Sequence, residues 1–305
     1  MSQMDGSAGL GVRSSLTEAA APPGSGGSAG NQPLLLRRGL NPDLAVWRGG
    51  QGAPTLVLVH GFGEGAFVWQ PILEAMATPA FVAPDLRGHG HSAWDPLHRY
   101  ETVDHVMDLA AILGSLHLDD IILVGHSLGA AVSLHLAAMH PDRFRGLVLV
   151  DYSPDMDAAG SAAVCKAFRD EQRSYESPEA YISAVKRARP LAEKRVVNRI
   201  APRALMREEQ GYILRRDPAL ALPSGTDPAV EAAEMWRALP EIRCPILIAR
   251  GVASALVSPA SVARMVAVAR DARLITIARA GHAVMMDNPR GLAAEIETFR
   301  ADLDR

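Results

Sequence analysis

Short, uninterrupted apolar runs recur along the chain and alternate with segments of helical periodicity. Runs that are apolar on both faces are typical of strands covered on both sides, which predicts a mostly parallel sheet with helices on each face. The expected strands are 55–59, 81–83, 121–124, 146–150, 245–249 and 274–277. The expected helices are 103–116, 130–139, 261–268 and 292–303.

The beginning of the chain does not fit this alternation. Residues 1–32 are rich in Gly, Ser and Ala, and they cannot bury enough apolar surface to order themselves, so we expect a disordered tail. Apolar residues 34–36 and 44–47 flank Asn41-Pro42-Asp43, which predicts a hairpin closed by a turn.

The alternation stops again over residues 153–236, where helical patterns are punctuated by prolines and no convincing strand is visible. We expect a helical cap inserted over the carboxyl ends of the strands, with 33–152 and 237–305 forming the α/β core. The arginines of this cap are expected to lie on solvated helix faces with i,i+4 partners. The alternative is that one or two of them face the cleft and hold a carboxylate or phosphate. The arginines are Arg187, Arg189, Arg195, Arg199, Arg203, Arg207, Arg215 and Arg216.

Composition narrows the class of protein. With 305 residues, 48% of them hydrophobic, the chain can bury a core without a metal or disulfide. A net charge of −3 and 5% aromatic residues argue against a nucleic-acid binder. The two cysteines exclude a disulfide framework, and Cys165 is expected to be an ordinary buried thiol. No run approaches the ~20 apolar residues of a membrane span and no signal-peptide pattern is present, so we expect a cytoplasmic protein without a membrane partner.

The strongest local signal is Gly125-His126-Ser127-Leu128-Gly129, between an expected strand and an expected helix. G-x-S-x-G in this context is typical of a nucleophile elbow, and the context argues against a chance match. Such a turn strains the serine and places it at the positive end of a helix. Ser127 is therefore the candidate nucleophile, and His126 beside it is expected to pack or to form hydrogen bonds.

Two further segments could complete a catalytic site. His60-Gly61-Phe62-Gly63-Glu64-Gly65 follows the expected strand 55–59, and the Phe62 and Leu128 N–H groups could hold an oxyanion. A plain glycine-rich turn is the alternative for this loop. Gly281-His282 follows the last expected strand, where the base of a triad comes in the chain order serine, acid, histidine. The chain has no HExxH, CxxC or P-loop motif, so neither a metal nor another cofactor is expected.

Together with Asp85-Leu86-Arg87-Gly88-His89-Gly90-His91-Ser92 and Asp287-Asn288-Pro289, these motifs resemble the α/β-hydrolase superfamily over residues 34–303. The resemblance implies an eight-stranded, mostly parallel sheet with helices on both faces and a helical cap after the sixth strand. Epoxide hydrolases and haloalkane dehalogenases share this fold but use an aspartate nucleophile, so Ser127 argues against both activities.

The sequence departs from the superfamily at the acid. The family pattern after the seventh strand is similar to Arg-Gly-x-x-Ser-Asp, but this chain ends the motif Arg250-Gly251-Val252-Ala253-Ser254 with Ala255. Three explanations are open: Asp151 is the acid, Ala255 replaces an original aspartate, or the enzyme is impaired. We favour Asp151, because it ends the strand next to the elbow strand and a triad needs its carboxylate only to orient and stabilise the imidazole.

The sequence thus predicts a serine hydrolase that cleaves a carboxylic ester or a related small acyl compound through an acyl-enzyme. Ser127, His282 and Asp151 are the expected triad, and Phe62 and Leu128 the expected oxyanion hole. Lactone, thioester or C–C bond hydrolysis with the same residues remains open. From a different class, an impaired relative that only binds a ligand also remains open. The substrate and the oligomeric state are not predicted.

Overall fold

The computed structural model describes residues 43–53, 55–77, 79–171, 174–223 and 225–305, and the backbone of 15–18 and 33–37. Most of the expected disordered tail, and Asn41-Pro42 of the expected turn, lie outside the described residues.

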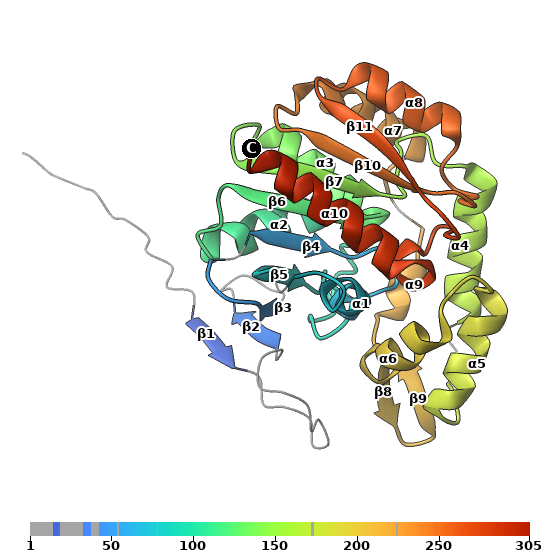
Figure 1. Cartoon of the computed structure of the whole chain (residues 1–305). Coiled ribbons are helices and arrows are strands. Elements are labelled where there is room, and N and C mark those ends of the chain that lie inside the picture. The colour runs from blue at the N-terminus through green and yellow to red at the C-terminus, as the bar shows by residue number, and fades with distance from the viewer. Residues whose placement is uncertain are drawn as a thin grey trace, which may run out of the picture.

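A mostly parallel sheet forms the centre of the molecule, in the order β1-β2-β3-β5-β4-β6-β7-β10-β11 (Figure 1). Its strands are β1 Ser15–Glu18, β2 Pro33–Arg37, β3 Leu44–Gly49, β4 Leu56–Val59, β5 Phe81–Pro84, β6 Ile121–His126, β7 Phe144–Val150, β10 Ile246–Gly251 and β11 Ala272–Ile277. Neighbours from β5 to β11 pair in parallel, and β2 pairs with β3 antiparallel as the hairpin prediction requires. The count exceeds the expected eight because β1, inside the expected tail, pairs with β2.

Helices cover both faces of the sheet, as the apolar runs predict. They are α1 Gln70–Leu73, α2 Thr102–Ser115, α3 Leu128–Met139, α7 Pro228–Ala238, α8 Pro259–Val268, α9 Val284–Asp287 and α10 Pro289–Leu303, with the short 3-10 turns η1 Ala66–Trp69 and η3 Leu239–Glu241. Strand β4 shows why its run is continuous. Leu56 and Leu58 join one apolar cluster with α1 and α10, whereas Val57 and Val59 join the other with α2 and α3.

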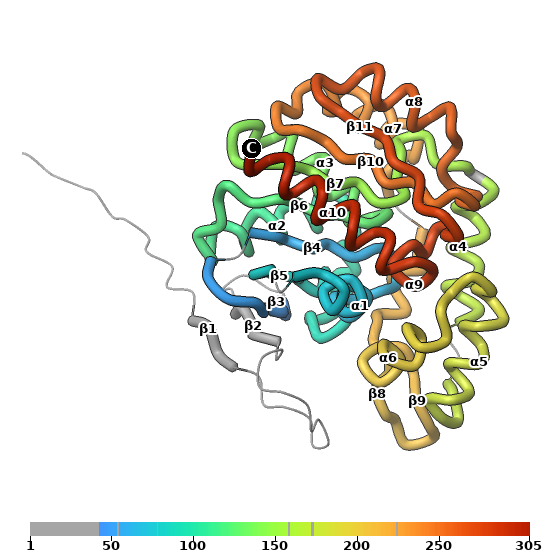
Figure 2. The backbone as a smooth tube through the Cα atoms, viewed as in Figure 1, coloured from blue at the N-terminus to red at the C-terminus, as the bar shows by residue number. Residues whose placement is uncertain are grey.

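Residues 153–236, the segment expected to form a cap and called the cap from here on, contain α4 Ala158–Asp170, α5 Pro178–Ala188, α6 Lys194–Ala204, β8 Leu205–Glu208, β9 Gly211–Leu214 and η2 Pro218–Ala221. The expectation that residues 153–236 hold no strand is wrong, because β8 and β9 form a short antiparallel hairpin beside α5 and α6 (Figure 2). Each strand has four residues and little alternation, too short for a clear period-two pattern. Helix α7, at the end of this segment, contacts α3 of the core.

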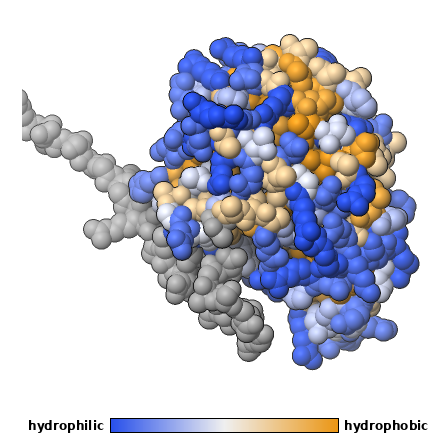
Figure 3. Space-filling model, viewed as in Figure 1, coloured by the Kyte–Doolittle hydropathy of each residue, from blue (hydrophilic) through white to orange (hydrophobic). Residues whose placement is uncertain are grey.

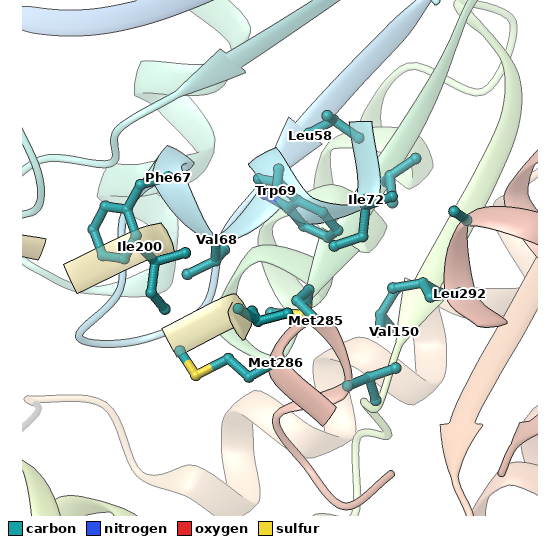
Figure 4. Packing of buried hydrophobic residues seen from close by; sticks show 14 of the residues in the cluster. Leu58, Phe67, Val68, Trp69, Ile72, Val150, Ile200, Met285, Met286 and Leu292 are labelled. Atoms are coloured by element: carbon teal, nitrogen blue, oxygen red, sulfur yellow. The ribbon is translucent and has the colours of Figure 1, made fainter. Parts of the chain in front are cut away.

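The cap is joined to the core by apolar packing. Ile200 of α6 lies beside Phe67 and Val68 of η1, and Met286 of α9 lies near it (Figure 4). The cluster continues into the cap through Tyr181, Val185, Val196, Val197, Ala204, Leu205 and Leu214. The outer surface seen in Figure 3 is mainly hydrophilic, with hydrophobic residues gathered toward α8 and β11. Within the described ranges, no helix is long and apolar enough to span a membrane.

His105 on α2 is fully buried, and its titration should make the free energy of unfolding depend on pH. Burial, followed by the charge of Arg87, lowers the pKa of His105 to about 3, below its value near 6.5 in an unfolded chain. The unfolded state therefore binds the extra proton first as the pH falls. Stability that is complete above pH 6.5 should be lost toward pH 3, by up to about 1.4 kcal/mol per pH unit.

Urea unfolding of the wild type and of His105→Leu between pH 7.5 and 4.5 measures this loss. The variant should show a shallower pH slope by up to one proton, while His140→Gln, at an exposed position, should keep the wild-type slope. Equal slopes in wild type and His105→Leu would contradict the expectation.

Candidate active site

The segment that carries Ser127 is a strained turn between β6 and α3. Ser127 has φ 51° and ψ −118°, a backbone conformation with positive φ that residues other than glycine rarely adopt. The residue is 8% exposed. The flanking glycines allow the turn to close. A Cβ on Gly125 would lie 2.3 Å from the Gly129 carbonyl oxygen, and one on Gly129 would lie 2.2 Å from the Val59 carbonyl oxygen. The two glycines of G-x-S-x-G are therefore required by close backbone packing, whereas the strained backbone angles are those of Ser127 itself.

His282 and Asp151 meet at the carboxyl edge of the same sheet. His282 Nδ1 lies 2.8 Å from Asp151 Oδ2, within hydrogen-bond reach. Asp151 follows β7 and is fully buried, and His282 lies in the loop after β11 with 23% of its side chain exposed. Because Nδ1 donates to the carboxylate, Nε2 is the ring nitrogen free to accept a proton.

The loop after β10 supports Asp151. Ser254 Oγ donates to Asp151 Oδ2 at 2.6 Å, and the Gly251 N–H donates to Asp151 Oδ1 at 2.8 Å. Ala255, where the family pattern places an acid, is exposed. The segment that would have supplied a carboxylate thus supplies hydrogen-bond donors to the one at Asp151.

The electrostatics of His282 suit a base near neutral pH. Burial lowers the pKa of His282, the hydrogen bond and charge of Asp151 oppose that effect, and His126 adds to it. The net pKa is below the usual value, so the imidazole is neutral at neutral pH.

The loop after β4 holds Phe62 between two fixed peptides. The Gly61 N–H donates to Glu64 Oε2 at 3.0 Å, and the Gly63 N–H donates to His89 Nε2 at 3.0 Å. The end of the loop is tied by Asp85, whose Oδ1 accepts from the Ala66 N–H at 2.6 Å. The loop is therefore more than a plain glycine-rich turn, since bonds on both sides preorganise the peptide of Phe62.

Comparison with known proteins supports this architecture. A model of the alpha/beta hydrolase family matches residues 56–295. The chain belongs to the alpha/beta hydrolase family. The resemblance that the motifs indicated is thereby confirmed, and so is the fold class.

Relatives of this hydrolase differ in their named activities. Esterase Rv0045c of Mycobacterium tuberculosis is 30% identical over 269 residues, which cover 86% of each chain. The 2-(acetamidomethylene)succinate hydrolase of Mesorhizobium japonicum is 29% identical over 254 residues, covering 81% of this chain and 87% of that protein. A haloalkane dehalogenase of the same organism is 24% identical over 279 residues, covering 85% and 88%.

Solved structures agree with these matches. The crystal structure of E-2-(acetamidomethylene)succinate hydrolase aligns with a TM-score of 0.76 and 26% identity, covering 85% of this chain and 95% of that one. The crystal structure of esterase Rv0045c aligns with a TM-score of 0.73 and 27% identity, covering 92% and 93%.

A cavity of the hydrolase lies between the cap and the loop after β4. Gly63, Glu64 and Phe67 line it from the core, and Met286 of α9 lines it beside them. The cap contributes Glu171, Tyr181, Val185, Arg189, Ala204, Leu214, Arg215 and Arg216. A wider cavity of about 620 Å³ lies on the outer side, between α1, α6 and α10, and its lining contains none of the expected catalytic residues. The cavity beside the loop after β4 measures about 20 Å³, and its lining likewise contains none of the expected catalytic residues.

Four arginines of the cap contact the core. Arg199 donates to Glu74, which caps α1, and Arg203 donates to Gln70 at the start of α1, so these two do not form the expected i,i+4 pairs along their own helix. Arg216 donates to the carbonyl oxygens of Gly63 and Phe168 at 3.3 and 3.0 Å. Arg189, on the cavity, donates from Nη1 to the Met286 sulfur at 3.3 Å, a weak acceptor.

Sequence reasoning missed several residues around the site. Nothing in the glycine-rich motif indicates a role for Glu64, because its contact with His126 spans 62 positions. The departure from the family pattern at Ala255 likewise gives no sign that Ser254 donates to Asp151. The expectation for Cys165 is wrong: its thiol is exposed, because most described side chains of α4 face solvent. Among the described residues, no group of His, Cys, Asp or Glu could hold a metal ion.

Proposed function

We propose that this hydrolase cleaves a carboxylic ester or a related acyl compound with Ser127 as the nucleophile. The observation that carries the proposal is the strained elbow at Ser127, on the same sheet edge as the hydrogen-bonded pair of His282 and the buried Asp151. A backbone strain of this kind is retained where the position of the side chain matters.

The steps follow from the geometry. Ser127 Oγ attacks the acyl carbon while His282 Nε2 takes its proton, and Asp151 stabilises the imidazolium that forms. The Phe62 and Leu128 N–H groups stabilise the negative oxygen of the tetrahedral intermediate. His282 then returns the proton to the leaving group, and a water activated by the same histidine cleaves the acyl-enzyme.

The relatives bear on the substrate in two ways. Among them, the one named an esterase favours ester cleavage, and a serine at the nucleophile position favours acyl transfer over dehalogenation. Lactones, thioesters and carbon–carbon bonds next to a carbonyl can react with the same groups, so they stay alternatives. Arg189, on the small cavity next to the loop that carries Phe62, is a cation that a carboxylate-bearing ester could pair with, so such esters belong among the substrates tested.

Active-site labelling tests the proposal. A fluorophosphonate should add to one serine of the wild type, identified by mass spectrometry as Ser127, and not to Ser127→Ala. A panel of acyl esters, lactones, thioesters and carboxylate-bearing esters then ranks the substrates by kcat/KM. An unlabelled Ser127 in a folded protein would favour the other class, a ligand-binding relative without turnover.

A further inference from the structure

Two charged side chains lie beside the catalytic residues and take no part in the steps above. His126 directly precedes Ser127, and Glu64 lies in the loop that carries Phe62. Their side chains are 2% and 8% exposed, respectively. Removing ionisable groups from water costs free energy, which a pair of opposite charges offsets only in part. Two such groups beside the catalytic residues therefore suggest a role there.

Both ring nitrogens of His126 lie within hydrogen-bond distance of an oxygen atom. Its Nδ1 lies 3.2 Å from Glu64 Oε2, and its Nε2 lies 2.9 Å from the backbone carbonyl oxygen of His282. A carbonyl oxygen accepts only, and an ionised carboxylate accepts only. Glu64 Oε2 also accepts the Gly61 N–H at 3.0 Å. With Glu64 ionised, both ring nitrogens of His126 donate, and that is the imidazolium form.

The charges agree with this geometry. Burial alone would raise the pKa of Glu64, but the charge and hydrogen bond of His126, together with the charges of Arg189 and His60, outweigh it and bring the pKa to about 2. Burial alone would lower the pKa of His126, but the charge and hydrogen bond of Glu64, together with the His282 carbonyl and the charge of Asp151, outweigh it and raise the pKa. Glu64 and His126 are thus a buried ion pair.

We propose that His126 is a positioning residue: a buried imidazolium, neutralised by Glu64, that holds the His282 loop against the nucleophile elbow and disfavours a second positive charge on His282. The His126 and His282 rings have centroids 4.8 Å apart with planes tilted by 42°, close enough for a direct charge effect. The inference rests on the proposed function, since it assigns His282 the role of base.

Other charged groups face this pair and must be weighed. Asp151 contacts His282 from the end of β7, and His60 acts on Glu64 from the end of β4. Arg189, after α5, acts on both Glu64 and Asp287 of α9. The charge of Asp151 favours protonation of His282, and the charge of Arg189 favours the ionised form of Glu64. The charge on the neighbouring His126 ring opposes protonation of His282.

The pH profile of kcat/KM tests the proposal, because its acidic limb reports the pKa of the base in the free enzyme. His126→Gln removes the cation and leaves Glu64 charged, and both effects favour protonation of His282. The acidic limb should move up by about 0.5–2 pH units. Glu64→Gln removes the anion and with it the charge of His126, so its limb should move up by less.

A purely structural role would give a different result. If His126→Gln lowers kcat/KM equally at every pH and leaves the acidic limb in place, the proposal is overturned. The wild type supplies a measurement that needs no variant to fold: ¹⁵N NMR of the His126 ring should show two protonated nitrogens at pH 7–8, and one bare nitrogen would overturn the proposal. Because fluorophosphonate labelling tests Ser127 separately, failure of the proposed function is distinguishable from failure of this inference.

Discussion

Ser127→Ala is expected to lower kcat by on the order of 10³–10⁶-fold while the protein remains folded. The hydroxyl is the only group at the elbow that forms the acyl-enzyme, so its loss removes the covalent route and leaves only what the oxyanion hole and substrate binding contribute. Initial rates on one ester, with the thermal transition as the test of folding, measure the effect.

Ser133→Ala is the matched control. Ser133 lies in the helix that follows the elbow, fully buried, and its hydroxyl donates to the Gly129 carbonyl oxygen. Its loss should leave kcat near the wild-type value. Turnover close to wild type by a folded Ser127→Ala protein would remove Ser127 from the mechanism.

Asp151→Asn is expected to lower kcat/KM by up to about 10⁴-fold, as the equivalent change does in a serine protease of unrelated fold. The asparagine oxygen can keep the Gly251 N–H, which turns the amide nitrogen toward His282 Nδ1. Nδ1 must then accept, the ring proton moves to Nε2, and Nε2 can no longer take a proton from Ser127.

Ala255→Asp separates the two accounts of the acid. With Asp151 already 2.8 Å from His282, and Ala255 exposed, an added carboxylate should change kcat/KM little. Asp155→Asn serves as the control, since this exposed carboxylate bonds Arg264 and Trp236 rather than the histidine. A large rescue by Ala255→Asp together with an indifferent Asp151→Asn would show instead that the chain has lost its acid.

The sheet was predictable because its signals are local and strong. All six expected parallel strands are present. Five of them are buried on both faces, which explains their unbroken apolar runs, whereas β11 is a partly exposed edge strand. The elbow was predictable for a related reason. A Cβ added to either glycine beside Ser127 would lie under 2.5 Å from a backbone oxygen, so only glycine fits at both positions. Sequence and fold agree wherever one residue type is the only one that fits.

The misses have a common physical cause. The hairpin of β8 and β9 depends on a pairing between two four-residue strands, and the pair of Glu64 and His126 depends on two loops meeting at the sheet edge. Neither contact leaves a periodic trace in the chain. The pairing of Asp151 with His282 could be argued from strand order, but the support from Ser254 needed the folded loop.

The apolar cluster that runs from α6 into η1 and α9 has a consequence for engineering this scaffold. Caps are inserted between core strands, which invites the exchange of one cap for another as a cassette. In this protein the residues that hold the cap include residues of the core. Ile200 of the cap packs beside Phe67 and Val68 of the core, with Met286 near them. A transplanted cap must bring matching side chains at those core positions, and one of them, Met286, comes only four residues after His282. Exchanging the cap of this hydrolase therefore means redesigning the segment that follows His282 at the same time.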